Sequence, residues 1–298
     1  MIMRKLIIIF LFLAVNVWFA LGWTPPSPIT PPDTIPDAIA NMNFGITGGS
    51  VPSAPGAATD YTADAYMISY WMMEQATGAG ALDGSATNND LTAFGDASGP
   101  TQSATSQEGT YSCDYESSDE EGHIIADASI AGNGTYGFPG STNASHTSSF
   151  SAGAWVRAES AVAYAAVMGK WAEEDLSWAI RYHAVNTSWN FLISNDGSAE
   201  TNINSDTTPT MDGTVWYHVV GVFDDTANLI YIYVNGYSDA TAVAHTTALN
   251  TNAVSFRVAN TEASAKFDGL VDEVFVIARA LSAAEVLEIY TSGLDGGG

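Results

Sequence analysis

Short hydrophobic runs recur along the chain from residue 65 to residue 277, and most of them alternate apolar and polar positions. A period of two places successive side chains on opposite faces of an extended strand. Clusters of Gly, Asn, Asp and Ser separate the runs, and such clusters are typical of turns. The spacing predicts an antiparallel sandwich. The strands that we expect lie at 65–74, 111–115, 123–126, 150–157, 164–170, 177–183, 188–194, 216–223, 229–234, 254–259 and 270–277.

One helix is predicted immediately after the last strand. Ser282 is a good N-cap residue, and Glu285 stands three places further on, where a capping box needs it. Leu281 and Val286 flank this start and can form a hydrophobic staple. The pattern therefore predicts a short amphipathic helix that begins after Ser282.

The closing segment carries a more specific signal. Residues 267–290 read FDGLVDEVFVIARALSAAEVLEIY. This segment resembles the end of the LamG-like (laminin G-like, concanavalin A-like) jelly-roll domains, where F-x-G-x-x-D-E-V is followed by R-A-L-S-x-x-E. Residues 83–92, 150–157, 216–223 and 229–236 resemble other strands and turns of the same family.

The resemblance implies an all-β fold. The fold that we expect is a concanavalin A-like two-sheet antiparallel β-sandwich (jelly roll) with a short C-terminal helix. In such a jelly roll the first and last strands are neighbours.

The chain is expected to have four parts. Residues 1–22 have a basic start, an apolar run and small residues at the end, which is typical of a cleaved secretory signal peptide. Residues 23–60 hold eight of the 11 prolines and read as an extended linker. Residues 61–293 form the LamG-like domain, and 294–298 form a Gly-rich tail. The protein is therefore expected to be secreted or at the cell surface; the alternative is an uncleaved N-terminal anchor.

Charge limits the choice of partners. The chain has 8 Lys and Arg against 33 Asp and Glu, a formal net charge of −25. This argues against nucleic acid and against an anionic membrane surface, because both need basic groups. Many carboxylates also favour cation binding. The alternative explanation is a surface adapted to salty surroundings, and the two are compatible.

No catalytic motif was found in the sequence. Glycoside hydrolases with this architecture place two carboxylates on one strand face, as E-x-D-x-x-E or E-x-D-x-E, and this pattern is missing. Asp272 and Glu273 are adjacent, so regular alternation would point them to opposite faces of the strand. We therefore expect a non-catalytic protein.

The resemblance implies a possible structural calcium ion, because several LamG-like domains bind one between the first and last strands. Carrying this over residue by residue gives Asp83 and Asp272 as the main ligands, with Glu74, Asn88 and Asp268 as lesser candidates. The alternative is that Asp83 and Asp268 only cap turns.

Aromatic side chains could form a platform for a glycan. The candidates lie in one region of the chain, and the alternative role for them is core packing. They are Trp171, Trp178, Tyr182 and Trp189.

These features favour a secreted, non-catalytic recognition module that binds carbohydrate or an extracellular protein. The alternative is a structural or adhesive component of a cell envelope or particle. A glycan-active hydrolase is disfavoured by the missing carboxylate pair.

Overall fold

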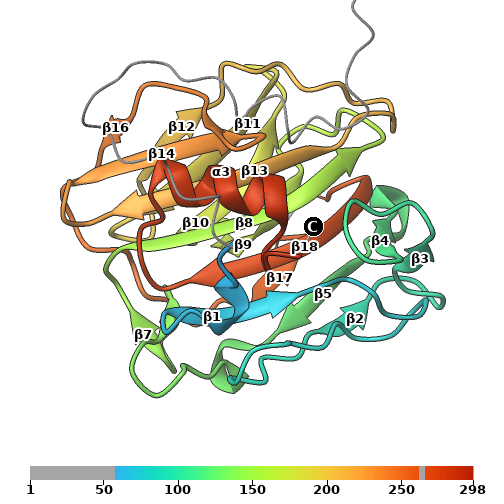
Figure 1. Ribbon diagram of the computed structural model, residues 1–298, viewed down its shortest axis with the longest axis horizontal. Helices are drawn as coiled ribbons and strands as arrows, with labels where there is room; N and C mark the ends of the chain where they lie inside the picture. Colours follow the sequence, from blue (N-terminus) through green and yellow to red (C-terminus); the bar gives the residue numbers. More distant parts are fainter. Residues whose placement is uncertain (1–57, 262–265, 298) are drawn as a thin grey trace, which may run out of the picture. The chain divides into compact units, whose positions relative to one another are not determined.

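The computed structural model describes residues 58–261 and 266–297 (Figure 1). The expected signal peptide and almost all of the expected linker lie outside the described residues. Within them, no helix is long and apolar enough to cross a membrane.

Two antiparallel sheets form the domain, and the larger contains nine strands (Figure 1). Its strand order is β15-β14-β13-β8-β18-β4-β3, with β1 also paired to β18 and β16 to β14. The strands are β1 (Met67–Trp71), β3 (Thr101–Ser103), β4 (Ser112–Tyr115), β8 (Phe150–Ala158), β13 (Tyr217–Asp224), β14 (Leu229–Val234), β15 (Tyr237–Ser238), β16 (Val243–Ala244) and β18 (Gly269–Ile277).

The second sheet contains seven strands in the order β12-β11-β10-β9-β17-β5-β2. They are β2 (Thr92–Phe94), β5 (Gly122–Ile125), β9 (Ala166–Ala172), β10 (Asp175–His183), β11 (Ser188–Ser194), β12 (Glu200–Asn204) and β17 (Phe256–Val258). The remaining strands form a small parallel pair, β6 (Phe138–Pro139) and β7 (Ser145–His146). There are also three 3-10 helices, η1 (Tyr61–Ala63), η2 (Ser117–Asp119) and η3 (Asp127–Ser129).

The inner faces of the two sheets enclose the main core. Trp178 and Phe191 from the seven-stranded sheet and Val156 and Val219 from the nine-stranded sheet belong to one cluster of buried side chains. Each large apolar side chain buried in this way stabilises the fold by about 1.5–3 kcal/mol. The two-sheet sandwich predicted from the strand pattern is confirmed.

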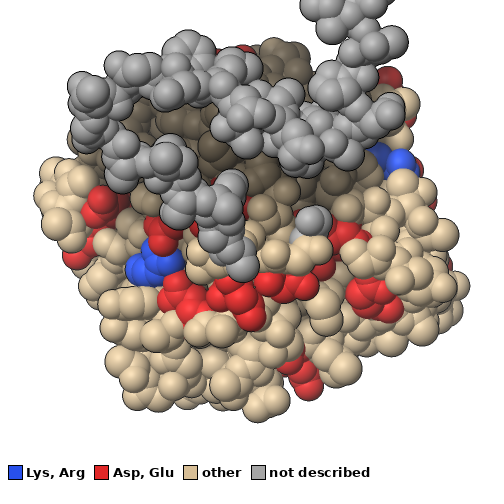
Figure 2. All heavy atoms as spheres, viewed as in Figure 1, with Lys and Arg blue, Asp and Glu red and all other residues tan. Residues whose placement is uncertain are grey.

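The single described α-helix, α3 (Ala283–Ser292), packs on the outer face of the nine-stranded sheet. Its Val286 and Ile289 share a second buried cluster with Val220 of β13. The predicted capping box is present: Ser282 Oγ accepts from the Glu285 amide at 3.3 Å, and Glu285 Oε2 accepts from the Ser282 amide at 2.7 Å. Figure 2 shows acidic side chains gathered on the face that carries α3.

The first and last strands are neighbours, as the resemblance implied. β1 pairs antiparallel with β18, and Trp71 lies opposite Val274. This pairing ties the start of the domain to its closing segment.

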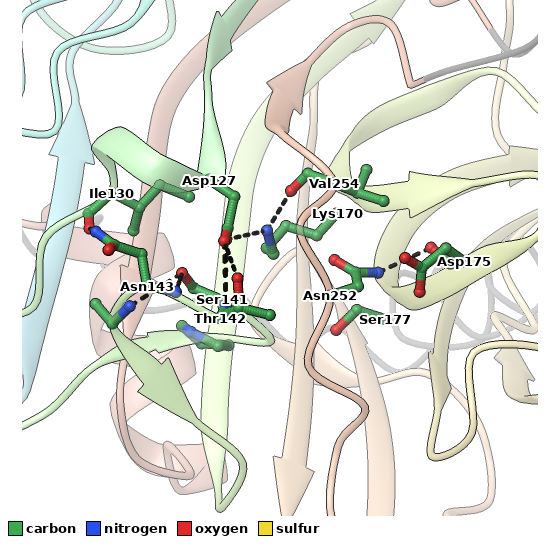
Figure 3. Close-up of polar contacts among 12 residues, drawn as sticks. Asp127, Ile130, Ser141, Thr142, Asn143, Lys170, Asp175, Ser177, Asn252 and Val254 are labelled. Atoms are coloured by element: carbon green, nitrogen blue, oxygen red, sulfur yellow. Dashed lines mark hydrogen bonds and ion pairs between the residues drawn. The ribbon is translucent and has the colours of Figure 1, made fainter.

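A buried ion pair lies at one end of the core (Figure 3). Lys170 on β9 pairs across the sheet with Trp178, so its side chain points inward. Its Nζ donates to Asp127 Oδ1 at 2.8 Å and to the Val254 carbonyl. Asp127 also accepts from the Thr142 amide and hydroxyl. The pair joins a strand to three irregular segments, which contain Asp127, Thr142 and Val254.

Candidate functional site

The residues predicted to bind calcium lie in three separate places. Asp83 is buried in the opening loop. Its Oδ1 accepts from the amides of Tyr70 and Ser85, at 3.1 and 2.9 Å. Its Oδ2 accepts from the Thr87 hydroxyl at 2.7 Å and from the Asn89 amide at 2.9 Å. Both oxygens therefore accept hydrogen bonds within the opening loop, which fits the turn-organising alternative.

Asn88 and Asp268 form hydrogen bonds in two other loops. Asn88 is exposed in a left-handed conformation (φ 54°), and its amide nitrogen donates to the Ala86 carbonyl at 3.3 Å. Asp268 precedes β18 and accepts from the Ser117 amide and the Ser160 hydroxyl. Both arrangements are typical of loop caps.

Near Asp268, three other carboxylates from Asp114, Glu116 and Glu159 come within 4.8 Å of one another. Burial, followed by the charge of Glu159, raises the pKa of Asp114 to about 6. Glu116 and Glu159 are exposed. This acidic cluster is therefore mostly solvated.

Asp272 and Glu74 lie in one acidic site. Asp272 is fully buried on β18 and accepts from the amides of Gln107 and Glu108 at 2.9 and 3.2 Å. Glu74 Oε1 accepts from the amides of Thr110 and Tyr111 at 2.7 and 3.1 Å, in the same loop. We call Glu74, Glu108, Asp272 and Glu273 the acidic site.

The surroundings of Asp272 and Glu273 in the acidic site disfavour their ionisation. Burial raises the pKa of Asp272 to about 7, and Glu108 adds to this rise. Burial raises the pKa of Glu273 to about 8, and Asp272, Glu108 and Glu74 add to it. A divalent cation would relieve this repulsion, since calcium prefers carboxylate and backbone oxygens. Among the described residues, the group of three whose ligand atoms lie within 4.8 Å of one another is Asp114, Glu116 and Glu159, so calcium at Asp272 and Glu74 stays a prediction.

Glu273 joins the acidic site because β18 is irregular there. The register with β8 shifts between Asp272 and Phe275, and Glu273 has a φ of 47°. This is a β-bulge, which interrupts the alternation that was expected to separate the two carboxylates. The sequence did not point to Glu108 or Glu273, because a bulge has no clear signature in one sequence.

Three of the four predicted platform residues point into the core. Trp178 and Trp189 are fully buried, and Tyr182 is 5% exposed. Tyr182 pairs with Trp189 across β10 and β11, so both face inward. The prediction of a glycan platform on these three is wrong, because their ring faces are covered by core side chains.

Trp171 lies on the other face of the seven-stranded sheet, where it is half-buried. The Arg181 guanidinium lies 5.9 Å from the centre of the Trp171 ring and 5.1 Å from that of Tyr164. Tyr164 is 40% exposed. The cation therefore lies between two aromatic rings that are open to solvent on part of their surface.

Polar side chains complete this surface and form a closed ring of hydrogen bonds with Arg181. Arg181 Nε donates to Asn190 Oδ1 at 3.0 Å, and Arg181 Nη2 lies 3.4 Å from both oxygens of Glu200. Asn190 donates to Asn204 at 3.2 Å, Asn204 to Asn202 at 3.4 Å, and Asn202 to Glu200 at 3.2 Å. We call this surface the outer patch. It consists of Tyr164, Trp171, Arg181, Asn190, Glu200, Asn202 and Asn204.

Half-exposed aromatic rings beside fixed amide and charged groups can bind a polyhydroxylated ligand. The rings offer stacking area, and the partly exposed amides of Asn202 and Asn204 offer donors and acceptors. The sequence indicated Trp171 but not the polar residues. The alternation of Glu200, Asn202 and Asn204 was the available signal, because it places three polar side chains on one face of a strand.

Comparisons with solved structures find the same architecture at low sequence identity. The binding domain of Paraclostridial Mosquitocidal Protein 1 aligns with a TM-score of 0.58 at 14% identity, over 76% of this chain and 52% of that one. The binding domain of botulinum neurotoxin DC in complex with SialylT gives 0.55 at 14% identity, over 78% and 52%. The chain thus spans about half the length of these binding domains.

A third similar structure matches over nearly its whole length. It is domain 4 of AbnA, a GH43 extracellular arabinanase from Geobacillus stearothermophilus, in complex with arabinotriose. The TM-score is 0.52 at 15% identity, over 75% of this chain and 98% of that one. A comparison with curated proteins found no match.

The family assignment comes from the sequence itself. The family described as the concanavalin A-like lectin/glucanases superfamily matches residues 131–287. This segment runs from the loop before β6 into α3 and covers more than half of the chain. The chain therefore belongs to the concanavalin A-like lectin/glucanases superfamily.

Proposed function

We propose that this protein is a non-catalytic recognition module that binds a glycan on the outer patch. The observation that carries the proposal is the Arg181 guanidinium between Tyr164 and Trp171, closed into a circuit of amide and carboxylate groups. A sugar ring offers an apolar face to aromatic rings and hydroxyl groups to amides, so this combination suits a glycan. Family membership supports the proposal.

The similar structures further support a glycan as the class of ligand. One was solved in complex with arabinotriose and another with SialylT, so this architecture binds such ligands elsewhere. One neurotoxin binding domain was solved with a protein, rat synaptotagmin II. A protein partner is therefore the competing outcome of the test.

We further propose that the module acts outside the cell and holds one structural calcium ion. Residues 1–22 would direct export, and Asp272 and Glu74 would hold the ion. The acidic site belongs to β18, its flanking loop and the end of β1, whereas the outer patch belongs to the other sheet. The ion would therefore stabilise the fold and leave ligand binding unchanged.

The test is binding of the full chain to a panel of polysaccharides by affinity electrophoresis and calorimetry, with calcium and then with chelator. Trp171→Ala should weaken binding about tenfold, since losing one ring contact costs about 0.5–1.5 kcal/mol beyond buried area. Tyr237→Ala is the matched control, because Tyr237 is an exposed aromatic residue on the other sheet. Binding to no polysaccharide, or equal loss in both variants, would overturn the proposal.

A further inference from the structure

The outer patch contains one opposed pair of charges. Arg181 is mostly buried and Glu200 is partly exposed, with side-chain exposures of 12% and 36%. Arg181 Nη2 lies 3.4 Å from both oxygens of Glu200, so the carboxylate occupies one end of the guanidinium. The pair contributes no net charge to the patch.

The other arginine on this face of the sheet, Arg257, does not change the net charge of the outer patch. Arg257 lies on the same face, because it pairs with Gly169, which in turn pairs with Ala179 beside Arg181. Its guanidinium lies 5.3 Å from the ring of Phe94, toward the opposite edge of the sheet. The chain as a whole carries a formal charge of −25. An anionic ligand would therefore meet a patch of no net charge on a strongly acidic protein.

The free hydrogen-bonding groups of the patch suit hydroxyl groups. Each Asn amide nitrogen can donate twice. Asn202 and Asn204 each use one of these hydrogens within the patch and keep one available. Glu200 carboxylate oxygens accept from partners and would repel another carboxylate. A hydroxyl group both donates and accepts, so it can satisfy both kinds of group.

We propose that the glycan bound by the outer patch is a neutral polysaccharide, and that Glu200 excludes uronic acids and sulfated sugars by holding Arg181. The inference rests on the proposed function and specifies the ligand class of the same site. Without Glu200, Arg181 would present a guanidinium fixed between two rings. Such a group binds carboxylate and sulfate strongly through paired hydrogen bonds.

The experiment uses the full chain and the neutral polysaccharide from the panel that binds best. It compares this polysaccharide with its carboxymethylated and hydroxyethylated derivatives at equal degrees of substitution. The two derivatives carry similar added bulk but differ in charge. Affinities are measured at about 0.15 M ionic strength, where distant surface charges are largely screened. The variants are Glu200→Gln and, as a control of equal charge change, Asp225→Asn, an exposed residue in the β13–β14 turn.

The wild-type protein should bind the carboxymethyl derivative at least tenfold more weakly than the hydroxyethyl derivative. Glu200→Gln should remove most of this difference, and Asp225→Asn should leave it in place. Equal binding of the two derivatives by the wild-type protein would overturn the inference while leaving the proposed function intact. A preference that survives in Glu200→Gln would overturn the role of Glu200. Binding to no polysaccharide would instead refute the proposed function.

Discussion

Lys170 and Asp127 form an ion pair of 2.8 Å in which the two side chains are 0% and 4% exposed. Burial lowers the pKa of Lys170, and Asp127 opposes this effect. Hydrogen bonds from Lys170 and Thr142 outweigh burial and lower the pKa of Asp127. Each charge therefore favours the ionised form of its partner inside the core (Figure 3).

Removing either partner should destabilise the domain strongly. Lys170→Met leaves a buried carboxylate without its cation, which costs about 3–5 kcal/mol of unfolding free energy. Asp127→Asn leaves the lysine without its anion and should cost a similar amount. Urea unfolding followed by tryptophan fluorescence measures both. The double variant Lys170→Met/Asp127→Asn should cost less than the sum of the two, because neither charge is left alone. Additive losses would show that the pair is not coupled.

The strands could be predicted from the sequence, but the faces of their side chains could be predicted only in part. Alternation located β10 and β11, and the closing motif located β18 and α3. The register between β9 and β10 shifts between Leu176 and Trp178. A shift of one residue moves every later side chain of the strand to the other face of the sheet. Trp178 therefore joined the core, while Trp171 stayed outside. No feature of a single sequence marks such shifts.

Long-range pairing limited the site prediction as well. Asp83 and Asp272 resemble family positions at opposite ends of the domain, and β1 does pair with β18. The local turn chemistry of Ser85, Thr87 and Asn89 nevertheless occupies the Asp83 carboxylate. Glu108 lies in a loop without any motif, so its place beside Asp272 depends on the folded chain alone.

Substitution of Trp178 should lower the unfolding free energy much more than substitution of Trp171. Trp178 is fully buried and its Nε1 donates to the Pro139 carbonyl at 2.9 Å, so Trp178→Ala should cost about 3–5 kcal/mol of unfolding free energy. Trp171→Ala should cost less than about 1 kcal/mol, because the residue is only half-buried on an outer face. Thermal unfolding of the two variants gives the comparison. A large loss for Trp171→Ala would mean that its ring is structural, and its effect on binding could then not be assigned to stacking.

Calcium should raise the melting temperature through Asp272. An ion bound at one hundred times its dissociation constant adds about 2.7 kcal/mol of unfolding free energy, which corresponds to about 5–10 °C for a domain of this size. Asp272→Asn should abolish this rise. Asp83→Asn should lower the melting temperature through its lost hydrogen bonds but keep the rise with calcium. A rise that persists in Asp272→Asn would place the ion elsewhere.

Acid should weaken the fold through His218. Its side chain is 1% exposed, packs against Trp155, Phe275 and Tyr290, and has an Nδ1 without a hydrogen-bond partner among the described residues. Burial lowers the pKa of His218 to about 3, against about 6.5 for an exposed histidine. Between these values the unfolded chain binds a proton that the folded domain does not. The unfolding free energy therefore falls as the pH drops from about 6.5 toward 3.

His218→Phe keeps a ring in the same aromatic cluster and removes this titration. The unfolding free energy of the wild-type protein should fall between pH 7 and pH 4.5 by about 2 kcal/mol more than that of the variant. The comparison between proteins cancels the opposite contribution of Glu273, whose raised pKa makes acid favourable for folding. Urea unfolding at the two pH values, with chelator present throughout, gives both differences. Equal pH dependence in the two proteins would mean that His218 is protonated in the fold and that a cavity or water reaches its Nδ1.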